Sequence, residues 1–152
     1  MTPFHPRSAR VRELVRGGAL GRPRFGHAAF TFPATDPLNY RWRPELGGGS
    51  LLDVGIYCLA PLLEAADGPP TAVQGRAVMA TSGVDASFSG WLARGDFAAA
   101  FETSFEAPER QVLEIVGTEA RLDRREPIVH GFQGSGIAFD IVPMAVELIE
   151  ID

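Results

Sequence analysis

From Thr71 onward the sequence divides into short strand-like segments, and their close spacing constrains the fold more than any other feature. The expected strands cover residues 72–80, 86–94, 97–105, 111–116, 120–124 and 144–151. Most of the connections are short, and Gly95-Asp96 has the composition of a tight hairpin turn. A parallel neighbour needs a crossover of about a dozen residues, so these connections favour antiparallel pairing.

The sequence before Thr71 supplies the helices. Apolar residues at helical spacing predict a helix over 8–16, and 23–32 has the character of a strand. A long polar connection over 33–46 leads to the clearest helix, which we expect to begin with Ser50 as N-cap. Its expected buried stripe is Leu51, Leu52, Ile56, Leu59, Leu62 and Leu63. The predicted fold class is therefore α+β, a largely antiparallel sheet with helices on one face.

So few helices leave one face of the sheet open to solvent or to a partner. On 97–105, Phe97, Phe101 and Phe105 share one face with small residues, as a buried strand requires. The residues expected on the opposite face are small or mixed rather than charged: Ser87, Ser89, Trp91, Ala98 and Ala100. We therefore expect a homo-oligomer through the open face, with a solvated face as the alternative.

Composition excludes several classes of function. The 152 residues suit one domain, and the scattered arginines with a net charge of −5 give no basic stripe for nucleic acid. The longest apolar stretch, 51–66, contains Asp53, Pro61 and Glu64, so no membrane span is expected. A single cysteine suits a reducing, cytoplasmic location, and three dispersed histidines predict no metal site.

The chain contains no lysine, because all fourteen of its basic residues are arginines. Lysine is the cationic side chain whose pKa proteins tune for catalysis, whereas arginine stays charged. Any chemistry that needs such a lysine must obtain it from another polypeptide segment.

The segment with the clearest chemical content is GGGSLLDVGIY, residues 47–57. Glycines allow backbone to approach a ligand closely, and the helix N-terminus that follows favours negative charge. Asp53 and Tyr57 are four residues apart, so a helix would place both on one face, where they can grip and deprotonate a hydroxyl group. The alternative is an aspartate that serves the helix dipole and a tyrosine that packs in the core.

With YRWRPEL before it and FHPRSARVRELVRGGALGRPRFGHAAFTF upstream, this motif resembles the C-terminal domain of the Gfo/Idh/MocA oxidoreductases. The resemblance runs from about residue 4 to about residue 132 and is closest to the glucose–fructose oxidoreductase branch. It implies a glyceraldehyde-3-phosphate dehydrogenase-like C-terminal domain, which in the family follows an N-terminal Rossmann domain.

The same resemblance implies hydride transfer between NAD or NADP and a sugar or polyol. Tyr57 would then be the catalytic acid/base, and Asp53 would orient the substrate hydroxyl. The implied cofactor contacts are Gly48, Gly49 and Arg41. The implied substrate contacts are Tyr40, Trp42 and Arg43.

Two family features are missing from these residues: the glycine-rich turn that opens a βαβ unit and the Glu-Lys-Pro motif. A phenol ionises with a pKa of about 10 unless a cation lowers it, so Tyr57 without lysine is a poor base near neutral pH. We therefore expect residues 1–152 to be one substrate-binding and dimerisation domain, a fragment truncated at both ends. It would bind no cofactor alone and would need a Rossmann domain in cis or in trans. The alternative is a non-catalytic carbohydrate-binding or oligomerisation module.

Overall fold

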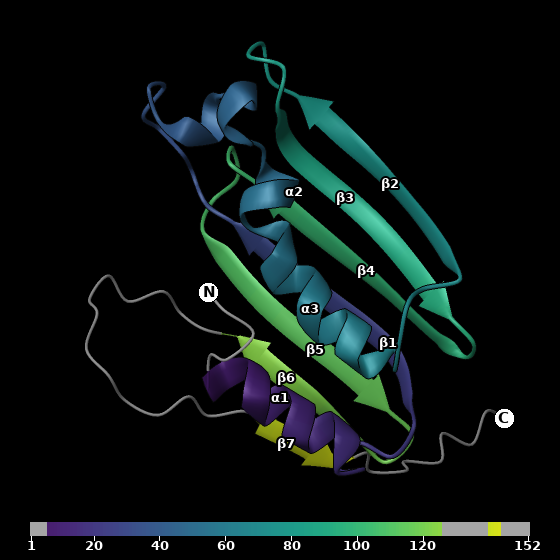
Figure 1. Ribbon diagram of the computed structural model, residues 1–152. Helices are drawn as coiled ribbons and strands as arrows, with labels where there is room; N and C mark the ends of the chain where they lie inside the picture. The colour runs from purple at the N-terminus through teal and green to yellow at the C-terminus, as the bar shows by residue number, and fades with distance from the viewer. Residues whose placement is uncertain (1–5, 126–139, 144–152) are drawn as a thin grey trace, which may run out of the picture.

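One seven-stranded sheet carries every described helix on the same face (Figure 1). The computed structural model describes residues 6–125 and 140–143. The helices are α1 (Pro6–Arg16), α2 (Ser50–Asp53) and α3 (Gly55–Ala65). The strands are β1 (Pro23–Thr31), β2 (Ala72–Met79), β3 (Asp85–Arg94), β4 (Phe97–Ser104), β5 (Arg110–Gly117), β6 (Ala120–Arg125) and β7 (Asp140–Pro143). The α+β prediction, with helices on one face, is confirmed.

The strand order is β2-β3-β4-β1-β5-β6-β7. Every neighbouring pair is antiparallel except β1 and β4, which run parallel. The largely antiparallel sheet is therefore as predicted, but the position of β1 between two meanders was not part of the prediction. Hydrophobic alternation identifies a strand without identifying its neighbours, so sheet order needs the tertiary structure.

The strands predicted over 72–124 agree with β2 to β6 to within a residue or two. Gly95 adopts a left-handed conformation with φ 55°, which confirms the hairpin turn. The strand predicted over 144–151 lies outside the described residues, and β7 was not predicted. The connection 33–46 is more ordered than expected, because it contains two 3-10 turns, Tyr40–Trp42 and Pro44–Leu46.

The prediction of one continuous helix from Ser50 is wrong. The helix breaks at Val54, and the segment Pro44–Asp53 meets α3 at 47°. The helical phase counted from Ser50 therefore fails, and Leu52 and Ile56 are 68% and 53% exposed rather than buried. Among the described residues no single helix is long and apolar enough to cross a bilayer, and this bent pair passes by length and composition only.

The core lies between α1, α3 and the middle of the sheet. Leu62 and Cys58 of α3 are buried against β1 and β4, and Val11 and Leu14 bring α1 onto the same cluster. Cys58 is only 2% exposed, and burial raises the pKa of its thiol to about 12, which fits the predicted small core residue.

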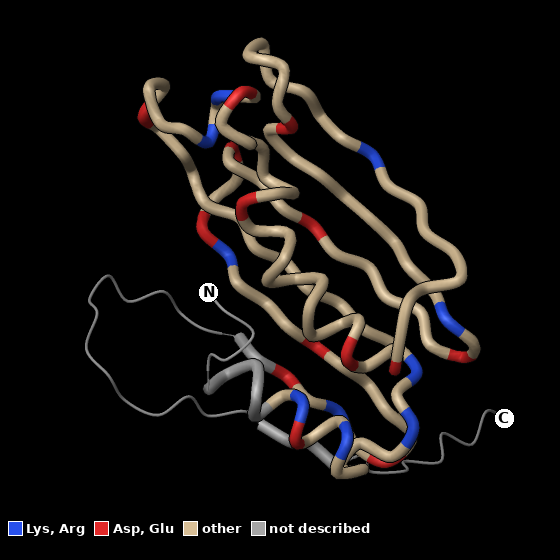
Figure 2. Tube along the Cα trace, viewed as in Figure 1, with Lys and Arg blue, Asp and Glu red and all other residues tan. Residues whose placement is uncertain are grey.

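The opposite face of the sheet is covered by no described helix (Figure 1). The cross-strand register places Trp91 opposite Ala100 and Ser89 opposite Glu102, so these residues share the open face as predicted. His27 lies on the same face, where its Nε2 is 2.9 Å from Glu102 Oε2. Figure 2 shows basic and acidic residues interspersed along the described trace, with no continuous basic stripe.

Candidate functional site

The loop before α2 begins its first 3-10 turn at Asn39, which caps that turn. The Asn39 side chain accepts a hydrogen bond from the backbone N–H of Arg41 at 3.1 Å. Asparagine before a helical turn is an ordinary N-cap signal, so this residue could have been found in the sequence. The cap orients the segment 40–43 relative to α2.

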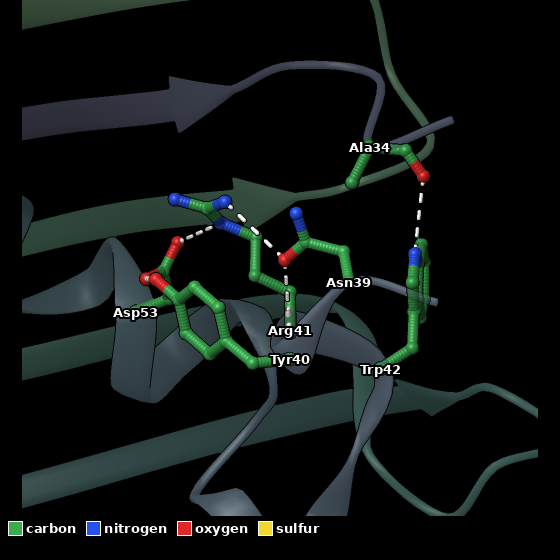
Figure 3. A network of polar contacts seen from close by, with 6 residues as sticks. All are labelled: Ala34, Asn39, Tyr40, Arg41, Trp42 and Asp53. Atoms are coloured by element: carbon green, nitrogen blue, oxygen red, sulfur yellow. Dashed lines mark hydrogen bonds and ion pairs between the residues drawn. The ribbon is translucent and has the colours of Figure 1, made fainter. Parts of the chain in front are cut away.

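Asp53, the last residue of α2, receives two side chains from this loop (Figure 3). The Tyr40 hydroxyl donates to Asp53 Oδ1 at 2.6 Å, and Arg41 Nε donates to Asp53 Oδ2 at 2.6 Å. Only 13% of the Asp53 side chain is exposed. Both carboxylate oxygens are therefore engaged within the chain.

The guanidinium of Arg41 is also enclosed by aromatic rings. It lies 5.3 Å from the centroid of the Phe32 ring and 4.9 Å from that of Tyr40. Such cation–π contacts are favourable by roughly 0.5–2 kcal/mol each, and more where water is excluded. Arg41 is thus held by the two rings as well as by the carboxylate of Asp53.

Tyr57 lies in the first turn of α3, with its ring 5.7 Å from that of Phe30. The pKa of Tyr40 is raised above its usual value, chiefly because its hydroxyl donates to Asp53, then by burial and by the Asp53 charge. Arg41 opposes this shift, and Tyr57 adds to it, so the two phenols are electrostatic neighbours. Of the two tyrosines of the chain, Tyr40 contacts Asp53 directly, and Tyr57 is near enough to contribute to the pKa shift of Tyr40.

Gly48 makes room for the chain's own loop. The N–H groups of Gly48 and Gly49 donate to the carbonyls of Arg43 and Arg41 at 3.0 and 2.9 Å. A Cβ at Gly48 would lie 2.5–2.8 Å from the backbone oxygens of Tyr40, Arg41 and Arg43. Both glycines are buried, so direct contact with a cofactor would require the loop to move, and that contact stays a prediction.

Asp85 of β3, rather than Ser50, caps the start of α2, so the predicted N-cap is wrong. Gly49 occupies the N-cap position with φ 115°. The Asp85 carboxylate accepts hydrogen bonds from the N–H of Leu51 and the hydroxyl of Ser50, both at 2.8 Å. The negative charge expected at this helix N-terminus comes from a strand distant in sequence, where local patterns give no signal.

Two of the predicted substrate residues make their contacts away from Asp53. The Trp42 indole N–H donates to the carbonyl of Ala34 at 3.1 Å, away from Asp53 (Figure 3), and its ring lies edge-on to Phe105. Arg43 pairs with Glu45 at the surface. Tyr40 alone of the three contacts Asp53, and the substrate contacts of all three remain predictions.

A cavity of about 400 Å³ lies on the other flank of the helices, between α3 and the β2–β3 hairpin. Its lining is mainly apolar and includes Leu59, Phe88 and Phe101, but not the Tyr40–Asp53–Tyr57 group. We place the candidate site at the latter group, because its side chains can exchange protons and bind hydroxyls. Within 6–125 and 140–143, no three His, Cys, Asp or Glu residues are placed to hold a metal ion.

Comparison with known proteins gives a family match. The model of the GFO/IDH/MocA C-terminal domain matches residues 8–123. A dTDP-3,4-didehydro-2,6-dideoxy-alpha-D-glucose 3-reductase of Saccharopolyspora spinosa is 34% identical over 78% of this chain and 36% of its own length. D-xylose 1-dehydrogenase (NADP(+)) 2 of Haloferax volcanii is 33% identical over 81% of this chain and 38% of its own.

Solved structures have the same fold. The aldose-aldose oxidoreductase from Caulobacter crescentus, complexed with glycerol, superimposes with a TM-score of 0.75 at 23% identity. The match covers 94% of this chain and 45% of that one. The chain thus spans less than half the length of the proteins that it matches here.

Proposed function

Because this chain belongs to the GFO/IDH/MocA family of oxidoreductases, we propose that it is the substrate-binding and assembly domain of an NAD(P)-dependent dehydrogenase. The proposed reaction moves a hydride between the nicotinamide and the hydroxyl-bearing carbon of a sugar or polyol. In support, two relatives are named for sugar substrates, and one of them for NADP(+). The chain spans 36% and 38% of these relatives, so the activity of the complete enzyme is part of the proposal.

The observation that carries the proposal is the hydrogen bond from the Tyr40 hydroxyl to Asp53 at the end of α2, with Tyr57 nearby in the first turn of α3. In the oxidative direction Tyr57 would accept the proton of the substrate hydroxyl, and in the reductive direction it would return it. Tyr40 and Asp53 would orient that hydroxyl through hydrogen bonds. The Tyr40 hydroxyl donates its proton to Asp53 in a hydrogen bond, which raises the pKa of this phenol and suits it to hold the substrate rather than to accept its proton.

Nucleotide binding is assigned to a Rossmann domain, in cis or in trans. The described residues do not form a phosphate-binding turn, since the N–H groups of Gly48 and Gly49 already bond to loop carbonyls. The cofactor would supply the hydride acceptor or donor. Arg41, which is paired with Asp53, remains the more accessible of the predicted cofactor contacts.

The isolated chain is expected to show no saturable binding of NADH or NADPH in titration calorimetry. The reason is that residues 6–125 and 140–143 form no phosphate-binding turn, and micromolar binding would contradict the assignment.

The coding sequence upstream of Met1 gives an independent test. An in-frame glycine-rich βαβ segment with a Glu-Lys-Pro motif would support a complete enzyme. A stand-alone start signal, together with sugar binding and no turnover when a Rossmann partner is added, would favour a non-catalytic carbohydrate-binding module.

We also propose that the open face of the sheet joins two copies of the chain. Trp91, on this face, is 43% exposed. Trp91→Glu should shift the mass measured by light scattering from dimer to monomer, because a buried unpaired charge is costly at an interface. Leu38→Glu, a matched change at a highly exposed loop residue, should leave the mass unchanged. A Trp91→Glu protein that remains dimeric would rule out this face.

A further inference from the structure

The contacts of Asp53 leave it poorly placed to be the first group that a substrate hydroxyl meets. Its Oδ1 accepts from the Tyr40 hydroxyl and its Oδ2 from Arg41 Nε, each at 2.6 Å. Its side chain is also largely enclosed. Tyr40, by contrast, is 44% exposed, and its oxygen can accept a further hydrogen bond while it donates to Asp53.

Arg41 is the most constrained member of this network. Besides Asp53, its guanidinium contacts Asn39 Oδ1 through Nη1 at 3.4 Å and lies over the rings of Phe32 and Tyr40. The pairs Arg24–Asp96 and Arg43–Glu45 are much more exposed to solvent. Ion pairs at the surface contribute little to stability, whereas an arginine held by several partners can fix the geometry of a site.

We propose that Arg41 is a positioning residue that acts through Asp53. It holds the carboxylate, and the carboxylate holds the Tyr40 hydroxyl. The substrate hydroxyl then meets a pair of phenols, one fixed and protonated and one that exchanges the proton. This inference rests on the proposed dehydrogenase function and adds to it the group that fixes the site.

Arginine suits this role in a chain without lysine. Its charge does not change over the pH range in which enzymes work, and its planar group keeps donors in fixed directions. The geometry around Asp53 is therefore independent of any proton on Arg41. A mobile ammonium would hold the same charge without fixing the direction of the hydrogen bond.

The chain offers a direct spectroscopic test, because it has only two tyrosines. In a Tyr57→Phe background Tyr40 is the only phenol, so the ultraviolet absorbance of phenolate against pH reports on Tyr40 alone. Its pKa begins above the usual value because of the bond to Asp53. Adding Asp53→Asn should lower that pKa toward about 10.

Arg41→Gln in the same background should also lower the pKa of Tyr40, because the carboxylate is no longer held against the phenol. A guanidinium that acted only as a nearby charge would give the opposite sign, since Arg41 itself lowers this pKa. A pKa that rises or stays unchanged overturns the proposal. Arg41→Lys, which keeps the charge and moves the donor, should also lower it and serves if the glutamine variant does not fold.

The matched control is Arg24→Gln, which removes an arginine–aspartate pair outside the site. It should leave the titration of Tyr40 unchanged, and circular dichroism at each pH should show that every variant is folded. A shifted Tyr40 pKa in the control would mean that the titration reports general destabilisation of the fold, and this result would also overturn the inference.

Kinetics in a complete enzyme separate this inference from the proposed function. Arg41→Gln should lower kcat on the order of 10²-fold, the effect of a small misplacement of catalytic groups, with a smaller change in KM. Full activity of Arg41→Gln beside an impaired Tyr57→Phe would overturn the positioning role alone. Full activity of both variants would overturn the proposed function as well.

Discussion

In a complete enzyme that contains this chain, Tyr57→Phe is expected to lower kcat by about 10²- to 10⁴-fold. The change removes only the phenolic oxygen, and the ring can keep its contact with Phe30. Sugar affinity should therefore change much less than turnover, because the lost interaction belongs to proton transfer. Steady-state kinetics followed by the absorbance of the reduced nicotinamide would measure both parameters.

Tyr40→Phe is the matched variant, because it makes the same atomic change at the neighbouring phenol. It should raise KM more than Tyr57→Phe does, since Tyr40 is assigned to orienting the substrate rather than to the proton transfer. A Tyr57→Phe enzyme as active as the wild type would remove Tyr57 from the chemistry. Equal losses in kcat for the two variants would contradict the proposed division of roles.

Gly48→Ala is expected to lower the free energy of unfolding by about 3 kcal/mol, at the upper end for an overpacked site. The added methyl group would lie within 2.8 Å of three backbone carbonyl oxygens, and backbone cannot yield as a flexible side chain can. The turn that carries Tyr40 and Arg41 would have to move away from α2. Urea unfolding followed by circular dichroism would measure the loss.

Gly47→Asn is the control for this prediction. Gly47 has a positive φ of 71°, and a Cβ there meets nothing within 4 Å. Asparagine tolerates this conformation, so Gly47→Asn should lower the free energy of unfolding by much less than Gly48→Ala does. If the two variants lose similar stability, the close packing at Gly48 is not what the glycine provides.

The sequence was most informative where structure depends on neighbouring residues. Alternation along β4 identified its buried face, and Gly95 marked its hairpin, because both signals are local. The helix break at Val54 was missed, because the apolar residues around it continue a helical spacing. The parallel pairing of β1 with β4 was missed for a related reason, since it joins segments that are remote in sequence.

The candidate site, like the fold, could be predicted from local sequence only in part. The spacing of Asp53 and Tyr57 and the resemblance around Tyr40 and Arg41 directed attention to the segment that holds the candidate site, and the roles of these residues remain predictions. The partners that set the geometry are harder to read. Asp85 reaches α2 from a distant strand, and Gly48, one of the glycines that suggested space for a ligand, instead admits the preceding loop.

The central position of β1 also bears on how the molecule assembles. The meanders β2-β3-β4 and β5-β6-β7 are each built from sequence neighbours, but they share no direct hydrogen bonds, because β1 separates them. Contacts such as Phe25 with Ala98 close a long loop, and such closure slows folding. We therefore expect each meander to form before the N-terminal strand joins the two. The loop with Tyr40 and Arg41 follows that strand directly, so the contact of Tyr40 with Asp53 depends on the segment that joins the two halves of the sheet.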